Sequence, residues 1–278
     1  MLRIQVLIAA YGSESLKRIA SLSHPVCEGV EYIVSWQNSS NGTIPDSLAR
    51  RPDFKIFVVP STGLCNNRNT LLEATDADIA VISDDDLEYE PHHFETIRKA
   101  YRENPDRHFL TFRYDSMAYV KQYPSFSFSL DRMPKGYFVT SMELTLNIRK
   151  IKEDGLMNVI RFNPAFGVNG THFGSGEEDI LLAKMLRNGL KGKFIPETIC
   201  FNTLSTTSDR ISHTRGFVQT KGAVMKYVKP NSWPLRMFTH AWREQKSEAT
   251  GLPSFFQYCQ WWIEGVRIAD QNKVFENP

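Results

Sequence analysis

Three adjacent carboxylates, Asp84, Asp85 and Asp86, directly follow an apolar run that ends at Ser83. Neighbouring carboxylates repel one another, and each costs free energy if it leaves water without a partner. Mg²⁺ and Mn²⁺ bind carboxylate oxygens and keep open positions for phosphate oxygens, so a divalent cation would compensate these charges. The alternative is a solvated acidic turn. We favour a metal site, because such turns rarely follow so apolar a strand.

A second acidic group opens a helix later in the chain. The segment Gly174–Asp179 reads Gly-Ser-Gly-Glu-Glu-Asp, and an amphipathic pattern follows it up to Asn188. Acids in a first helical turn complement the helix dipole, and Ser175 can serve as the N-cap, so a purely structural interpretation exists. The glycines also allow another group to approach the backbone closely, which that interpretation does not require.

A third segment, Ser61–Asn69, follows another apolar run and reads Ser-Thr-Gly-Leu-Cys-Asn-Asn-Arg-Asn. A glycine turn with amide and guanidinium donors at a helix start suits a nucleotide or a phosphate. The same residues suit an ordinary N-cap, so this segment alone does not decide between the two.

Short apolar runs and helical patterns alternate in the first half, and these elements must position the acidic and amide residues. Strands are predicted at 4–9, 30–35, 55–59 and 78–83, and helices at 13–22, 64–74 and 93–101. The run 78–83 is apolar on both faces, as expected for a central parallel strand covered by helices. Right-handed strand–helix–strand units predict an open α/β sheet, which binds ligands at the carboxyl ends of its strands.

The second half has a different pattern. Strands are predicted at 108–112, 125–130 and 137–148, in mixed or antiparallel pairing, and a helix at 177–188 that Gly189 ends. Residues 204–220 are polar, with little apolar periodicity, and are predicted to form a long loop of the kind that often acts as a lid.

Residues 231–270 are predicted to form two helices and hold four of the five tryptophans. We expect Trp233 and Trp242 to pack in the core. Trp261 and Trp262 could instead join nearby aromatic residues in a patch for a sugar acceptor, a lipid-linked acceptor or a partner subunit. The nearby residues are Phe255, Phe256 and Tyr258.

The composition is that of an ordinary globular protein, with 278 residues, 41% hydrophobic and 23% charged. The net charge of +2 gives no signal for a polyanion, so nucleic acid is not an expected partner. The four cysteines form no CxxC pair and are expected to be free thiols in a reducing compartment. No stretch is long enough for a membrane span, and no leader is recognisable, so we expect a cytoplasmic protein. Attachment to the inner membrane face stays open.

The three segments, in this order and with the first strand Val6–Gly12, resemble family 2 glycosyltransferases with the GT-A fold. The resemblance covers roughly residues 3 to 200, and the stretch Lys193–Glu197 is similar to the strand that follows the helix. It implies an α/β fold with a mostly parallel central sheet, flanking helices and a C-terminal helical tail. The expected domains are a catalytic domain at 1–225, with a donor half at 1–105 and an acceptor half with a mobile loop at 106–225, and a helical extension at 226–278.

The resemblance also implies residue roles. Asp84 and Asp86 match a DxD motif, in which Asp84 would contact the donor ribose and Asp86 would hold the metal that bridges the diphosphate. Asp179 matches the catalytic base, and Glu178 would position the acceptor. The remaining expected donor-binding residues are Ala9, Tyr11, Asn67, Arg68 and Asp85.

Two departures from the family pattern affect the expected ligands. Acids that often follow the second strand are replaced by Ser35–Asn38, so Gln37 would contact the nucleobase with an amide. A histidine that often acts as a further metal ligand is replaced by Asn202, and His213 could substitute for it or be a solvated loop residue. Basic residues of the polar loop could clamp the diphosphate or be ordinary surface charge. They are Arg210, Arg215 and Lys221.

The expected function is inverting transfer of a sugar from a nucleoside-diphosphate sugar to the hydroxyl of a saccharide or lipid-linked saccharide, with Mn²⁺ or Mg²⁺, in surface polysaccharide synthesis. Such a transfer needs one base for the acceptor proton and one cation for the leaving diphosphate. Two alternatives remain. One is a metal-dependent nucleotidyl or phosphoryl transferase, which would call for a Lys-bearing Gly-rich loop that residues 9–18 lack. The other is a non-catalytic nucleotide-binding scaffold. The oligomeric state is left open.

Overall fold

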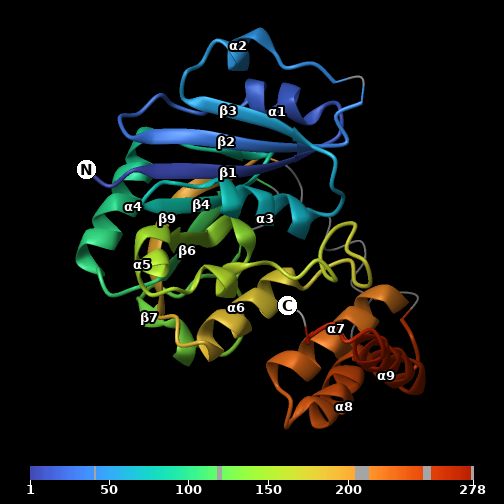
Figure 1. Cartoon of the computed structure of the whole chain (residues 1–278). Helices are drawn as coiled ribbons and strands as arrows, with labels where there is room; N and C mark the ends of the chain where they lie inside the picture. Colours follow the sequence, from blue (N-terminus) through green and yellow to red (C-terminus); the bar gives the residue numbers. More distant parts are fainter. Residues whose placement is uncertain (41, 118–120, 204–212, 247–251, 277–278) are drawn as a thin grey trace. The chain divides into compact units, whose positions relative to one another are not determined.

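The computed structural model describes residues 1–40, 42–117, 121–203, 213–246 and 252–276 (Figure 1). The strands are β1 (Ile4–Tyr11), β2 (Val30–Gln37), β3 (Phe54–Val59), β4 (Ile79–Asp84), β5 (Leu87–Glu88), β6 (Phe109–Ser116), β7 (Phe128–Ser129), β8 (Leu144–Asn147) and β9 (Gly192–Asn202). The α-helices are α1 (Ser15–Ser21), α2 (Asp46–Ala49), α3 (Leu64–Ala74), α4 (Pro91–Glu103), α5 (Ile148–Glu153), α6 (Glu177–Arg187), α7 (Arg215–Val228), α8 (Trp233–Glu244) and α9 (Phe255–Gln271). Three short 3₁₀ helices are η1 (Leu130–Arg132), η2 (Ser141–Glu143) and η3 (Met157–Ile160).

The chain divides into two compact units. Unit 1 comprises Met1–Thr62, Asn66–Arg161 and Lys184–Ser205, and it contains the strands named above. Unit 2 comprises Gly63–Cys65, Phe162–Ala183 and Thr206–Pro278, and it contains α7, α8 and α9.

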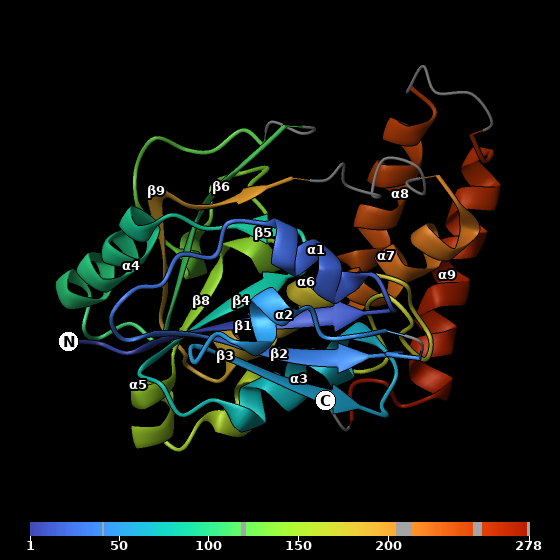
Figure 2. The same ribbon diagram turned by 90° about the horizontal axis from the view of Figure 1, so that it is seen from above.

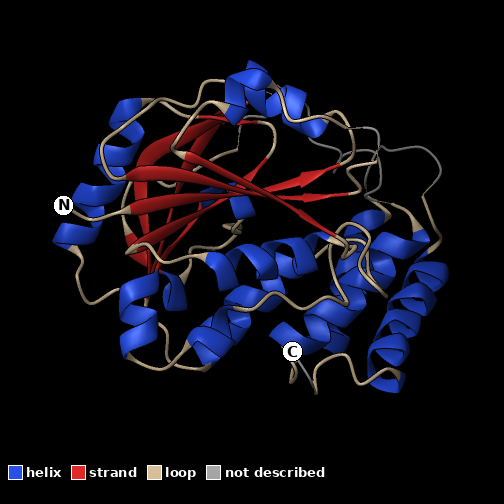
Figure 3. Ribbon diagram, turned by 45° about the horizontal axis from the view of Figure 1, so that its top comes forward, coloured by secondary structure: helices blue, strands red, loops and turns tan. Residues whose placement is uncertain are grey.

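Unit 1 is built on one mixed sheet with the strand order β3-β2-β1-β4-β8-β6-β9-β5, and β7 pairs with β9. The strands β3, β2, β1 and β4 are all parallel, so their carboxyl ends share one edge. Beyond β4 the pairing is mixed, because β8 runs antiparallel to both β4 and β6. Helices lie on both faces of the sheet (Figure 3). The predicted α/β class, with its mostly parallel donor half, is confirmed.

Strict alternation along the central strands explains how the helices of unit 1 are held. Val6 and Ile8 of β1 and Val81 of β4 face one side, where they pack in one core with α1 and α4. Leu16 of α1 and Phe94 of α4 are fully buried in this core. Figure 2 shows α1 and α4 along the sheet in a second view. The opposite face of these strands is buried as well, with Leu7 of β1 and Ile82 of β4 in the interior, as expected for central strands covered by helices on both sides.

The predicted strand at 137–148 is wrong in its first part. Residues 141–143 form η2, and only Leu144–Asn147 joins the sheet as β8. The reason is a buried charge: the fully buried carboxylate of Glu143 forms an ion pair with Lys121 and accepts hydrogen bonds from Tyr123 (2.8 Å) and Thr140 (3.1 Å). Such polar bonds hold the chain in a local turn that apolar alternation does not predict. The predicted strand at 125–130 is likewise reduced to Phe128–Ser129, which pairs with β9.

The predicted loop at 204–220 is wrong at its end, because α7 begins at Arg215. Residues 204–212 lie outside the described residues. The Thr214 side chain caps α7 by accepting a hydrogen bond from the backbone N–H of Phe217. Gly222 of α7 has a packing role. A Cβ at Gly222 would lie 2.2 Å from the backbone oxygen of Trp262 in α9.

Unit 2 depends on a close crossing of α7 and α9, and this gives a first prediction. A Cβ at Gly265 of α9 would lie 1.9 Å from the backbone oxygen of Gln219 in α7, which cannot move without shifting the helix. Gly265→Ala is therefore expected to destabilise the fold by about 1–3 kcal/mol, as overpacking does. Thermal denaturation followed by circular dichroism measures the loss. The matched control is Gly216→Ala in α7, where no atom lies within 4 Å of the added Cβ, and it should leave the melting temperature unchanged or raised. Equal melting temperatures for the two variants would contradict the crossing.

The structure reverses two expectations for the tryptophans. Trp242 was expected in the core, but its side chain is 57% exposed, because it lies on the outer side of α8. Trp262 was considered for a surface patch, but it is fully buried between α7, α8 and α9. Trp233 packs partly buried against the same core, as expected. The two predicted helices of residues 231–270 are confirmed as α8 and α9.

Candidate active site

The acidic turn lies at the carboxyl end of β4, in the middle of the parallel strands. Asp84 forms an ion pair of 2.9 Å with Arg68 of α3, whose side chain is only 1% exposed. Ser141 of η2 accepts a hydrogen bond from the same guanidinium at 2.8 Å and donates one to Asp84 at 3.5 Å. Arg68, expected to contact the donor, thus lies buried beneath Asp84 and holds its carboxylate in place.

Asp85 points to a different partner. Its carboxylate accepts a hydrogen bond of 2.7 Å from Arg18 of α1. Burial raises the pKa of Asp85 to about 6, although the Arg18 guanidinium acts in the opposite direction. Asp85 therefore fastens the acidic turn to α1, which the sequence could not indicate because the two residues are far apart in the chain.

Asp86 has the least compensated carboxylate of the three. Its Oδ2 accepts a hydrogen bond of 3.2 Å from Asn202 at the end of β9, whereas its buried Oδ1 has no hydrogen-bond partner among the described residues. Burial raises the pKa of Asp86, and the charge of Asp84 raises it further. A buried oxygen without a donor is costly unless a ligand binds it.

The carboxylate oxygens at this turn suit a hard divalent cation whose remaining ligands come from a substrate. Mg²⁺ is commonly held by one or two carboxylates together with substrate phosphates and water. Asp86 and Asp84 offer those carboxylates. In the part of the chain that the structure describes, no group of three or more His, Cys, Asp or Glu residues could hold a metal by itself. His213, the expected further ligand, belongs to unit 2, where its Nδ1 is paired with Glu244 of α8.

The expected nucleoside-binding residues gather at the ends of β1 and β2. Ala9 lies beside Asp84 in the parallel register, and Tyr11 lies beside Gln37. The amides are used within the fold: Asn67 donates to the backbone oxygen of Ala10 (3.1 Å). Gln37 likewise donates to the Ser61 hydroxyl (3.0 Å). The ring of Tyr11 is 52% exposed, so it is the group of this set that a nucleobase could stack on.

The second acidic segment lies in unit 2. Gly176 has φ +91°, and a Cβ there would lie 2.6 Å from Val224 of α7, so the close approach allowed by this glycine is filled by the protein itself. Glu177 is buried, whereas the side chain of Asp179 is exposed to solvent. Neighbouring protein atoms nevertheless displace water from part of the Asp179 carboxyl, and this desolvation raises its pKa to about 6. The charge of Glu178 is the smaller cause. Asp179 is thus a partly dehydrated carboxyl that a substrate can reach.

The basic residues expected to clamp a diphosphate have different outcomes. Arg210 lies outside the described residues. Arg215, at the start of α7, forms an ion pair of 2.8 Å with Glu264 of α9. Burial lowers the pKa of Lys221 in the same helix, with the charge of Glu244 acting against that effect.

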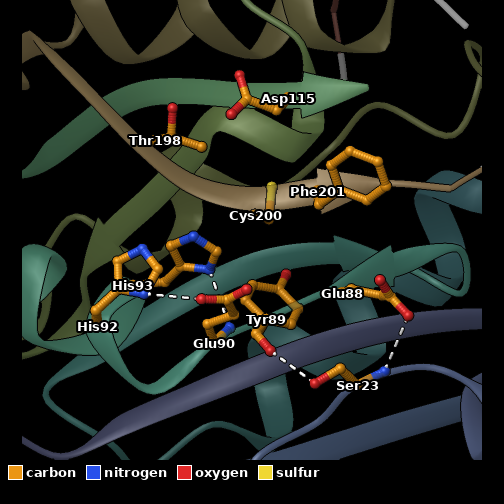
Figure 4. Close-up of a pocket in the computed structure, with 10 residues that line it drawn as sticks. All are labelled: Ser23, Glu88, Tyr89, Glu90, His92, His93, Asp115, Thr198, Cys200 and Phe201. Carbon is orange, nitrogen blue, oxygen red and sulfur yellow. Dashed lines mark hydrogen bonds and ion pairs between the residues drawn. The ribbon is translucent and has the colours of Figure 1, made fainter. Parts of the chain in front are cut away.

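Unit 1 also contains a polar pocket of about 430 Å³ between the start of α4 and the strands β6 and β9 (Figure 4). His93 lines it, and its Nδ1 accepts a hydrogen bond of 3.0 Å from the backbone N–H of Glu90. Burial, and then the charge of His92, lower the pKa of His93 to about 4, so the neutral ring carries its proton on Nε2. None of the residues that line this pocket was a candidate site residue in the sequence analysis.

Comparison with known proteins identifies the class. The model of the family "Glycosyl transferase family 2" matches residues 6–163, which is more than half of the chain. No curated protein sequence matches. The solved structure of S. aureus TarS 1–349 in complex with UDP has a TM-score of 0.60 at 12% identity, over 98% of this chain and 91% of that chain. The complex with UDP-GlcNAc has a TM-score of 0.60 at 13% identity, over 95% and 82%.

Another crystal structure of S. aureus TarS has a TM-score of 0.54 at 14% identity, and the match spans 81% of this chain but only 40% of that chain. At these identities the likeness concerns the fold. The family match and the similar solved folds show a glycosyltransferase with the GT-A fold, as predicted. The chain belongs to glycosyltransferase family 2. This assignment replaces the two alternatives, a nucleotidyl or phosphoryl transferase and a non-catalytic scaffold.

Proposed function

We propose that this glycosyltransferase transfers a sugar from a nucleoside-diphosphate sugar to an acceptor hydroxyl, with inversion at the anomeric carbon and with Mg²⁺ or Mn²⁺. The observation that supports this most directly is the buried Asp86 Oδ1 without a partner, next to Asp84 at the carboxyl end of β4. Parallel α/β sheets bind ligands at this edge. The surface-polysaccharide role and the saccharide or lipid-linked acceptor are part of the proposal through the family resemblance.

Asp86 and Asp84 would hold the cation by their carboxylates, and Asn202 and Arg68 keep these two side chains oriented. When bound, the cation supplies charge stabilisation for the diphosphate that leaves. Arg68 is too deeply buried to act as a surface clamp, so its contribution is to fix the position of Asp84. A substrate bound to the Asp84 carboxylate is oriented correctly only if that carboxylate is itself held in place.

Asp179 would accept the proton of the acceptor hydroxyl as its oxygen attacks the anomeric carbon. The new bond joins the acceptor oxygen to that carbon, the bond between carbon and diphosphate oxygen breaks, and its electron pair leaves with the diphosphate. A pKa of about 6 suits a general base, since the carboxylate is ionised at neutral pH yet more basic than an ordinary aspartate. Glu178 would help to position the acceptor.

Uridine is the proposed nucleoside, because the similar folds were solved with UDP and UDP-GlcNAc. The exposed ring of Tyr11 would stack on the base. A thermal-shift panel of UDP, GDP, ADP and CDP, each with and without Mn²⁺, tests this choice. Stabilisation by UDP that requires Mn²⁺ is expected. Equal shifts for all four nucleotides, or shifts that ignore the metal, would contradict it.

Transfer itself is tested by product analysis. The full chain, incubated with UDP-GlcNAc, Mn²⁺ and a saccharide acceptor panel, should release UDP, and mass spectrometry should detect the extended acceptor. Slow hydrolysis of the donor without acceptor is also expected. A chain that binds UDP with Mn²⁺ but neither hydrolyses nor transfers any of a panel of UDP-sugars would contradict the proposal.

The raised pKa of Asp179 predicts a pH dependence. The base must be unprotonated, so kcat/KM for transfer should fall about tenfold per pH unit below about 6 and reach a plateau above 7. An ordinary aspartate would hold its activity down to about pH 4. Because protonation of Asp86 would also weaken the metal site, donor binding is measured over the same range. A rate plateau that continues to pH 5, with donor binding intact, would contradict the assignment of Asp179.

A further inference from the structure

Unit 2 exposes a group of apolar side chains on α8 and at the start of α9. We call it the aromatic face; its exposed members are Leu235, Phe238, Trp242 and Phe256, and they are joined by Phe255, which is half-buried and also packs against the core of unit 2. Leu235 is 68% exposed, Phe238 50% and Phe256 83%. The ring of Phe255 links the two helices, with centroids 6.3 Å from Phe238 and 5.6 Å from Phe256. The face is thus continuous across two helices, which single exposed apolar residues are not.

The aromatic face is not needed for the packing of α8. Residues 235, 238 and 242 have the spacing of one helical stripe, and another stripe of the helix carries Met237 (5% exposed) and Ala241 (fully buried) into the core of unit 2. Since α8 is already held by that inner stripe, the outer stripe keeps large apolar residues in water without benefit to the fold. A ligand or partner surface explains them.

Among the described residues, the exposed charges of α8 beside the aromatic face are positive. Arg236, Arg243 and Lys246 are exposed, and none of them forms an ion pair among the described residues. The Lys246 Nζ lies 3.6 Å from the centre of the Trp242 ring. The acid of α8, Glu244, is turned to His213 instead. An apolar strip bordered by unpaired cations complements a surface that is apolar inside and anionic outside.

We infer that the aromatic face docks on the surface of an anionic lipid bilayer. Aromatic and leucine side chains enter the boundary between headgroups and acyl chains, and arginine and lysine contact lipid phosphates. In the described residues, no helix is both long and apolar enough to cross a bilayer, so the contact lies along the surface. A second copy of the chain is a poorer occupant, because a two-fold interface would place one positively charged face against an identical positively charged face. The inference does not depend on the catalytic proposal.

Flotation of the full chain with vesicles tests the docking. Vesicles of phosphatidylcholine with about a third phosphatidylglycerol should carry most of the protein, pure phosphatidylcholine should carry little, and added salt should release it. The double variant Trp242→Ser, Phe256→Ser should bind about tenfold less, because two aromatic side chains no longer enter the bilayer. Arg243→Gln should bind about fivefold less.

Matched controls make the same chemical changes away from this face. Phe126→Ser replaces a phenylalanine of unit 1 that is 59% exposed, and Arg102→Gln replaces an exposed arginine of α4; both should bind like the wild type. Circular dichroism confirms that each variant is folded. Equal binding to neutral and anionic vesicles, no binding at all, or equal losses in the controls would overturn the inference. So would a dimer in solution that the double variant abolishes while vesicle binding is absent.

Discussion

Asp179→Asn is expected to lower kcat for sugar transfer by roughly 10²–10⁴-fold, the usual contribution of a positioned general base. Asparagine has nearly the same shape but cannot accept the acceptor proton, and the exposed position of Asp179 lets the fold tolerate the change. Donor affinity in the presence of Mn²⁺ should stay within about twofold, because binding of the donor does not need this proton transfer. The measurement is initial-rate kinetics of transfer together with calorimetric binding of UDP.

The variant has two controls. Asp106→Asn makes the same change at an exposed ion pair with Arg107 in unit 1 and should leave the rate unchanged. The pH profile is the second, since the loss of activity below about pH 6 should disappear from the residual rate of Asp179→Asn if that carboxyl is the titrating base. Near-normal transfer by a folded variant that binds donor would remove Asp179 from the mechanism.

Asp86→Asn should combine loss of function with a gain in stability. The raised pKa of Asp86 means that its ionised form is less stable in the folded chain than in the unfolded one, so at neutral pH this carboxylate lowers the stability of the metal-free protein. Asparagine keeps an oxygen that can accept from Asn202 and removes the charge. The melting temperature without metal should rise by about 2–4 °C, which corresponds to about 1 kcal/mol for a protein of this size.

The same variant should lose metal-dependent UDP binding and at least about 100-fold of its transfer rate, since it removes one of the two carboxylates proposed to hold the metal. Asp84→Asn is the informative contrast. It removes the carboxylate paired with the buried Arg68, so the melting temperature should fall instead of rising. Activity should be lost in both variants. If Asp86→Asn were less stable than the wild type and still bound UDP with Mn²⁺, Asp86 would be a structural residue.

The sequence predicted the donor half of the fold well, for identifiable reasons. The run 78–83 has a strong apolar pattern, and the helix at 64–74 follows a glycine turn and carries Leu71 and Leu72 on its apolar side; both recur as β4 and α3. The failures have local causes that apolar patterns do not report. Glu143 is buried with Lys121 inside a predicted strand, and the Thr214 side chain caps a helix that begins inside the predicted loop 204–220.

For the candidate site, the sequence indicated the acids but not what holds them. Three adjacent aspartates after an apolar strand are visible without a structure. Arg18 and Ser141, which contact Asp85 and Asp84, come from distant segments, and nothing in their own neighbourhood marks them. Asn202 was noticed only as a departure from a family pattern, yet it is the residue that contacts Asp86. Long-range register, which no local pattern encodes, decides such partners.

The contact between Asn202 and Asp86 limits where the chain can accept insertions and deletions. Asn202 faces Leu87 across the antiparallel pair of β9 and β5, and its neighbour Phe201 faces Glu88. Inserting one residue in β9 before Asn202 would shift the register by one, so that Phe201 would occupy the place of the amide, whereas deleting one residue would bring Thr203 there. The number of residues in β9 up to Asn202 is therefore constrained, and natural insertions in this enzyme are expected to accumulate in its loops instead.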